Sequence, residues 1–278
     1  METFFSLMAA PTVACMILAV IYTYFGVHVL KREIIFIDLS LAQLAALGTT
    51  VAFVLEMKPD SWGASTLSLG FILLGSAFFT YTRSLIWRVP QEAVIGITYV
   101  VCSSSAILLV NQTPHGAEHL KDLLNGSILW MNWERVSHLA VVVFIVSFIH
   151  WKFRNRFFNI SKSYQQENAT SNSFILWDFL FYITLGLVII TSVQTVGMFL
   201  VFTYLIIPAV CGTFFFHSMR MQFYLGSIIG IIGSFIGLII SYYGDLPTGA
   251  TLVCSFGIIF LAALLLHHFF DFHKKTES

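Results

Sequence analysis

The residues best suited to chemistry are few, and two of them stand close together. Asp38 and Gln43 lie in the run DLSLAQLAALG, among small and apolar residues. A carboxylate can attract a cation, and a glutamine amide can offer it a neutral oxygen ligand. An acid at the centre of a membrane span costs about 2.5 to 3.5 kcal/mol on insertion scales, so it predicts a functional role. The two residues predict a cation pathway; the alternative is an Asp38 paired with Lys31 or Arg32 at the membrane edge.

A second set of metal-binding side chains comprises His115 and His119, in the sequence HGAEH. This spacing is that of inverted zinc proteases, in which both histidines and the glutamate share one helix. Pro114 and Gly116 flank the first histidine and disfavour a helix there. We interpret the segment as an outer loop whose histidines stay solvated or collect metal ions. A metalloprotease is the least favoured alternative.

The composition indicates that a lipid bilayer must surround the elements that position these residues. Of the 278 residues, 58% are hydrophobic and 10% are charged, whereas about 25% are charged in a soluble domain. The formal net charge is zero, so the chain lacks the excess of basic residues that is typical of nucleic-acid-binding proteins. Each of the four cysteines lies inside an apolar run and is interpreted as a small core residue.

Hydropathy predicts an all-α, polytopic membrane protein that forms a single transmembrane domain over residues 1–278. About eight full spans are expected, plus a short broken helix at Val196–Phe216, which Pro208 interrupts. The expected full spans are Ala9–Leu30, Ile34–Met57, Trp62–Leu85, Ala93–Val110, Val136–Phe153, Phe174–Ser192, Phe223–Tyr243 and Thr251–Phe270.

The distribution of basic residues predicts the orientation. If the interrupted stretch counts as a crossing, eleven Lys and Arg residues fall on one side and three, Lys58, Lys121 and Arg135, on the other. The positive-inside rule then places the N-terminus outside and the C-terminus in the cytoplasm. The polar segment at 154–173 becomes a cytoplasmic loop, and the histidines of the tail HHFFDFHKK anchor the last span.

Two patterns predict close helix packing or a solute route. Asp38, Ala42, Ala45 and Thr49 share one face of a helix, and Ser40, Gln43, Leu47 and Thr50 share another. Glycines at 226, 230, 233 and 237 form a ridge that packs within the chain or between two copies. The break at Pro208 either borders a solute route or is a simple kink.

Four segments carry a family resemblance. The run VGMFLVFTYLIIPAVCG, followed across one span by SYYGDLPTGATLV, resembles the membrane subunit of bacterial zinc/manganese-type ABC importers. VPQEAVIGITY and KDLLNGSILWM are similar to the fourth span of that family and the outer loop after it. The resemblance covers most of the chain, and the run around Pro208 is its most specific part.

The resemblance implies a permease of the bacterial inner membrane that imports a divalent metal ion by alternating access. Two copies would form the pathway, with two ABC ATPase subunits and an extracytoplasmic metal-binding protein as partners. The chain has no Walker A pattern, so it is not expected to be an enzyme, and ATP is expected on the partner subunit. Pro208, His217 and Arg220 are the coupling and gating candidates. No intrinsic cofactor is implied.

The second span departs from the family pattern. Family members carry an Asp followed four residues later by a His, but Ala42 stands four residues after Asp38. An alignment on Gly48 instead puts Gln43 at the His position and Leu39 at the Asp. A metal ion would then be held loosely, or a His such as His28 or His138 would join. A permease for a non-metal or unusual substrate and a non-transport membrane scaffold remain as alternatives.

Overall fold

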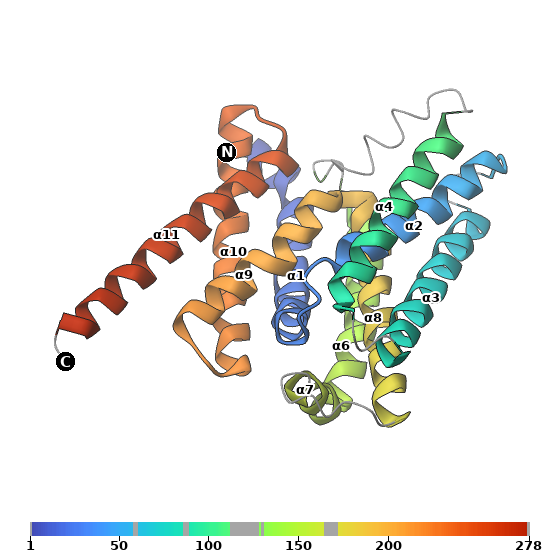
Figure 1. Cartoon of the computed structure of the whole chain (residues 1–278). Helices are drawn as coiled ribbons and strands as arrows, with labels where there is room; N and C mark the ends of the chain where they lie inside the picture. Colours follow the sequence, from blue (N-terminus) through green and yellow to red (C-terminus); the bar gives the residue numbers. More distant parts are fainter. Residues whose placement is uncertain are drawn as a thin grey trace. The chain divides into compact units, whose positions relative to one another are not determined.

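The computed structural model describes residues 2–57, 61–85, 89–111, 128, 131–163 and 172–276. Within these ranges the chain is helical and no strand occurs (Figure 1). The helices are α1 (Glu2–Arg32), α2 (Ile37–Val54), α3 (Trp62–Leu85), α4 (Gln91–Val110), α6 (Trp133–Lys152), α7 (Arg154–Ser163), α8 (Asn172–Val196), α9 (Met198–Phe215), α10 (Met219–Gly244) and α11 (Thr248–Thr276).

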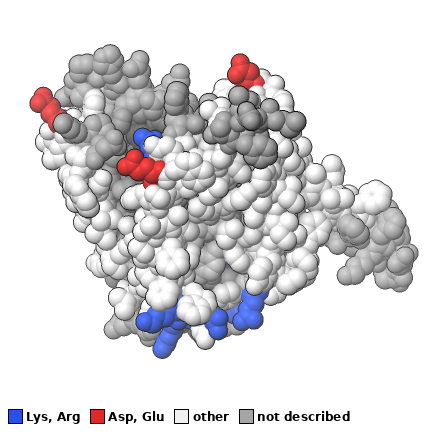
Figure 2. All heavy atoms as spheres, turned by 180° about the vertical axis from the view of Figure 1, so that it is seen from behind, with Lys and Arg blue, Asp and Glu red and all other residues white. Residues whose placement is uncertain are grey.

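Most of these helices are suited to a bilayer. In the described part of the chain, nine are long and apolar enough to cross a membrane, and α7 is the exception. In Figure 2 the charged side chains that are drawn gather near the top and the bottom of the view, and the band between them is almost free of charge, as a surface in contact with lipid requires. The prediction of an all-helical, multi-pass membrane protein is confirmed, while the orientation of its termini stays a prediction.

The chain folds as two compact units. Unit 1 comprises Met1–Leu30, Ser127–Ala140 and Phe199–Ser278, and unit 2 comprises Lys31–Gly126 and Val141–Met198. In unit 2, α2 packs against α3, α4 and α8. A Cβ atom added at Gly48 of α2 would lie 2.6 Å from the Cα atom of Ser68 of α3. The small residues of α2 therefore permit a close helix approach.

In unit 1, the glycine ridge of α10 packs against residues of the same chain. A Cβ atom at any of its four glycines would come within 3.0 Å of a neighbouring atom. The neighbours are Pro208 and Thr23 at Gly226, Ala19 at Gly230, Phe256 and Ile259 at Gly233, and Leu252 at Gly237. Of the two predicted roles, the structure supports packing within the chain.

The predicted short broken helix is corrected. Helix α9 runs without a break through Pro208, and the chain breaks instead at Gly197, which has φ 84° and separates α8 from α9. A glycine adopts this left-handed backbone at little cost, whereas other residues are strained there. Proline is tolerated inside a transmembrane helix because neighbouring helices can compensate for its lost backbone donor. The break therefore lies eleven residues before the predicted one.

The predicted cytoplasmic loop at 154–173 is also partly corrected, because its first half forms helix α7. This helix buries Phe157, Ile160 and Ser161. Burial of one face stabilises a helix too short to be stable in isolation. Residues 164–171 lie outside the described residues.

Candidate functional site

Asp38 occupies the first turn of α2, directly after the short link that joins α1 to α2. The link is held by Ile35, whose backbone N–H donates to a carboxylate oxygen of Glu92 on α4 at 2.9 Å. Asp38 is the acidic residue of the first turn of α2, and a helix N-terminus favours an acid. The local sequence thus places this acid where the backbone stabilises negative charge.

The Asp38 carboxylate is almost fully buried, with 1% of the residue exposed. In the part of the chain that the structure describes, neither of its oxygens has a hydrogen-bond partner. Arg32 directs its guanidinium to Asp178 instead, so the predicted alternative, an ion pair with Lys31 or Arg32, is not present. A buried acid without a countercharge is costly, and a bound cation would remove that cost.

The face of α2 that carries Asp38 leads to a small cavity. Its α2 wall consists of Ala42, Ala45, Ala46 and Thr49, and its α8 wall consists of Ile190, Val193 and Gln194. The cavity measures about 10 Å³, close to the minimum that holds one water molecule. The predicted stripe of small residues therefore borders a space, but one too narrow for a hydrated ion.

Gln43 lies on a different face and does not line this cavity. Its side-chain amide N–H donates to the sulfur of Met198 at 3.4 Å. Both residues are buried, and Met198 follows the break at Gly197 directly. Ser40, on the same face as Gln43, donates to the backbone oxygen of Ile95 in α4 at 2.5 Å. This face of α2 is therefore engaged in helix packing.

The predicted metal residues do not form one ready cluster. Across the described ranges, no three His, Cys, Asp or Glu side chains lie together as a metal site. His28 and His138, the histidines expected to join, belong to unit 1, where His28 is buried against Tyr24 and His138 is exposed. His115 and His119 lie outside the described residues, so their predicted role is untested.

The predicted coupling turn connects α9 to α10 in unit 1. The side-chain amide of Gln222 donates to the backbone oxygen of Phe216 at 2.7 Å. A Cβ atom at Gly212 would lie 2.6 Å from the backbone oxygen of Gln222, so the two helices meet closely here. His217 and Arg220 are exposed at this braced turn. A rigid turn with exposed polar side chains is suited to contact a partner protein.

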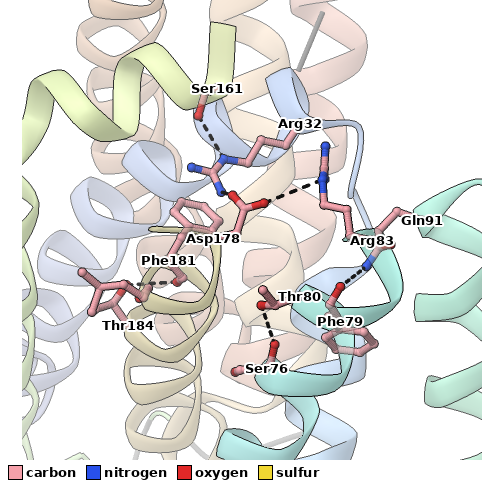
Figure 3. Close-up of polar contacts among 11 residues, drawn as sticks. Arg32, Ser76, Phe79, Thr80, Arg83, Gln91, Ser161, Asp178, Phe181 and Thr184 are labelled. Atoms are coloured by element: carbon pink, nitrogen blue, oxygen red, sulfur yellow. Dashed lines mark hydrogen bonds and ion pairs between the residues drawn. The ribbon is translucent and has the colours of Figure 1, made fainter. Parts of the chain in front are cut away.

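Unit 2 contains a buried charge cluster that was not predicted from the sequence (Figure 3). Arg32 at the end of α1 forms an ion pair with Asp178 of α8 at 2.9 Å, and Arg83 of α3 lies 3.7 Å from the same carboxylate. The Nε of Arg32 also donates to Ser161 of α7 at 3.0 Å. The guanidinium carbon lies 3.8 Å from the centroid of the Phe181 ring. One guanidinium thus joins the ends of three helices.

The signal for this cluster was present in the sequence. Asp178 stands in the apolar run FILWDFLFYITLG, just as Asp38 stands in an apolar run. Both satisfy the rule that an acid within a span is paired or functional. Only the tertiary structure separates the two cases, because the partners of Asp178 come from α1 and α3.

Comparisons with known proteins agree with this architecture. The model of a family described as the ABC 3 transport family matches residues 4–267. A "Probable metal transport system membrane protein" of Chlamydia trachomatis is 23% identical over 265 residues, covering 91% of this chain and 86% of the relative. The manganese import system permease protein ScaB of Streptococcus gordonii is 24% identical over 260 residues, covering 91% and 89%.

A solved structure shows the same fold. PsaBC from Streptococcus pneumoniae, in complex with Fab, matches with a TM-score of 0.75 and 19% sequence identity. The match covers 94% of this chain and 94% of that chain. Because the family model spans nearly the whole sequence, this protein is a member of the ABC 3 transport family.

Proposed function

We propose that this chain is the permease of an ATP-driven importer for divalent metal cations. The observation that carries the proposal is the buried, unpartnered Asp38 carboxylate, on a helix face that leads to a small cavity. Family membership and relatives named for manganese and metal transport support the cargo class. In this role the chain is a transport subunit and is not itself catalytic.

Asp38 would attract the cation by charge, and Gln43 would supply a neutral oxygen elsewhere along the route. A single carboxylate with neutral oxygens binds a divalent ion more weakly than a full set of His and Asp ligands. Weak binding suits conduction, because the ion must leave as readily as it enters. The narrow cavity between α2 and α8 would have to widen, which alternating access provides.

The partners follow from the proposed role. Two copies of the permease would form one pathway in the inner membrane, fed by an extracytoplasmic metal-binding protein. ATP would be hydrolysed on separate ATPase subunits, which would contact the turn at His217 and Arg220. Pro208 would transmit the motion, because its backbone oxygen lies 2.6 Å from the Cβ position of Gly226 on α10.

The test is uptake by the complete complex in vesicles. The permease, its ATPase subunits and its binding protein are reconstituted and supplied with zinc, manganese, iron or no metal. We expect ATPase stimulation by the loaded binding protein and uptake of at least one ion. A complex that hydrolyses ATP without moving any of these ions would contradict the metal cargo and favour an unusual substrate. A chain that stimulates no ATPase would favour a scaffold.

The pathway assignment needs a separate variant. Asp38→Ala combined with Gln43→Ala is compared with Ser40→Ala, which removes a packing hydroxyl from the same helix. We expect uptake to fall in the double variant and to persist in the Ser40 control. Normal uptake by the double variant would remove Asp38 and Gln43 from the route while leaving the permease role intact.

A further inference from the structure

Three charged side chains of unit 2 meet near the ends of α1 and α3 and the start of α8 (Figure 3). Nη1 of Arg32 lies 2.9 Å from Oδ1 of Asp178, and Nε of Arg83 lies 3.7 Å from Oδ2 of the same carboxylate. A charge-assisted N–H···O bond is about 2.7 to 2.9 Å long. The pair with Arg32 is therefore fully formed, whereas the pair with Arg83 is loose.

The two arginines also differ in how firmly they are held. Arg32 has a side chain that is 0% exposed. Its Nε donates to Ser161 of α7 at 3.0 Å, and its guanidinium carbon lies 3.8 Å from the centroid of the Phe181 ring. The side chain of Arg83 is 24% exposed, so water can solvate it when the carboxylate is distant. Arg32 thus has to stay paired with Asp178, while Arg83 tolerates a near and a distant acid.

This cluster lies at one end of the helices that line the small cavity. Only residues 33–36 separate Arg32 from α2, so α2 and α8 begin at the same end (Figure 3). Asp178 precedes Ile190 of the α8 wall by about 18 Å, at 1.5 Å per residue. The loose ion pair therefore stands at the end of the proposed route, and not within it.

Helix α3, which carries Arg83, packs against both walls of the cavity. Leu44 of α2 fills the space beside Gly75 of α3, and Ile72 of α3 fills the space beside Gly186 of α8. Close-packed helices move as rigid elements. A shift of α8 relative to α3 at the loose pair therefore changes the distance between α8 and α2.

We propose, on the basis of the transport role assigned above, that Arg83 is a gating residue. Its ion pair with Asp178 forms when the adjacent end of the route opens and breaks when that end closes. In the structure the pair is loose and the cavity measures only about 10 Å³, so the formed pair belongs to the wide state. There its Coulomb attraction offsets the cost of separating the α2 and α8 walls.

The test follows access to the cavity from the side that carries the ATPase subunits. Cys254, the exposed native cysteine, is replaced by Ser, and Ala45→Cys places a thiol on the α2 wall. The complex with its ATPase subunits and binding protein is reconstituted, and a membrane-impermeant maleimide is added on that side. We expect labelling rates of the nucleotide-free and the vanadate-trapped complex to differ about tenfold, the factor that ~1.4 kcal/mol of ion-pair energy supplies.

Three variants in this parent chain separate gating from folding. Arg83→Met should keep labelling slow in both states and lower uptake, because the wide state loses its ion pair. Arg83→Lys keeps a cation at the end of α3 and should restore both. Lys31→Met is the matched control, because it removes a cation one residue before Arg32, outside the cluster. The midpoint of thermal unfolding should be the same in all three.

Several outcomes would overturn the proposal. They are a nucleotide-dependent labelling change that persists in Arg83→Met, the loss of this change in Arg83→Lys or Lys31→Met, and its absence from the parent chain. A lower unfolding midpoint in Arg83→Met would also contradict it, because Arg83 would then support the narrow state.

The labelling does not depend on which solute is transported. A normal labelling change without uptake of zinc, manganese or iron would refute the metal cargo and leave the gate intact. Metal uptake by Arg83→Met at the rate of the parent chain would refute the gate and leave the cargo intact.

Discussion

Asp38 and Asp178 are both buried aspartates of unit 2, and within the described part of the chain only Asp178 has a countercharge. Asp38 is 1% exposed and Asp178 is 3% exposed. Asp178 accepts from Arg32 and lies near Arg83, whereas Asp38 has no hydrogen-bond partner among the described residues. The difference indicates that one acid stabilises the fold, and it supports the proposal that the other attracts a cation.

The largest expected effect concerns the paired acid. Asp178→Asn leaves the fully buried Arg32 without its countercharge, which typically costs about 3 to 5 kcal/mol. We expect a large fall in thermal stability, measured by size-exclusion chromatography of heated samples. Arg32→Met with Asp178→Leu should recover most of the loss, because apolar residues can replace a buried pair. If Asp178→Asn were as stable as the wild type, the proposed difference between Asp178 and Asp38 would be wrong.

Replacing the unpaired acid, Asp38, should affect transport more than stability. Asp38→Asn removes no hydrogen bond, so thermal stability should stay level or rise. Metal uptake by the reconstituted complex should fall about tenfold or more, the equivalent of losing ~1.4 kcal/mol of cation attraction. A variant that loses stability but transports normally would show that Asp38 is structural, like Asp178.

The change Gly197→Ala tests whether stability depends on the left-handed backbone at the break between α8 and α9. Ala at φ 84° would be strained by about 1 to 2 kcal/mol. We expect Gly197→Ala to lower the free energy of unfolding by that amount, measured by thermal denaturation. The control is Gly96→Ala. The latter glycine has open space around its Cβ position and lies inside α4, so its replacement should not destabilise. Equal effects of the two changes would contradict a special role for the break.

The smallest expected effect concerns the contact between Gln43 and Met198. Met198→Leu keeps the volume but removes the sulfur acceptor, so the cost should stay below about 1.5 kcal/mol. A double-mutant cycle with Gln43→Leu should show a coupling of about 0.5 kcal/mol or more. Strict additivity of the two changes would mean that the amide does not depend on this sulfur.

The fold was largely readable from the sequence because a span needs a long apolar run that few other structures need. The expected span at Trp62–Leu85 matches α3, and that at Ala93–Val110 matches α4 within two residues. The helix break was predicted at Pro208 because proline disrupts an isolated helix more strongly than glycine does. In the folded chain, neighbouring helices accommodate Pro208, and the break lies at Gly197. Helix α7 was missed because its stability comes from burying one face, which composition does not reveal.

The candidate site was only half predictable. Asp38 and the small residues on its face follow from composition and from the helical repeat. The α8 side of the cavity, with Gln194, and the contact of Gln43 with Met198 join residues far apart in the chain. No local pattern encodes such pairs, because they depend on which faces of two helices meet.

The sequence by itself determined that this chain is a multi-pass helical membrane protein with two acids, Asp38 and Asp178, inside apolar runs. It did so because unpaired polar groups are unfavourable in lipid. Membrane spans are therefore long runs of apolar residues, which can be recognised in the sequence. Only the tertiary structure decided which acid is neutralised. Arg32 and Arg83 reach Asp178 from other helices, and electrostatic pairing depends on distance in space, which separation along the chain does not give.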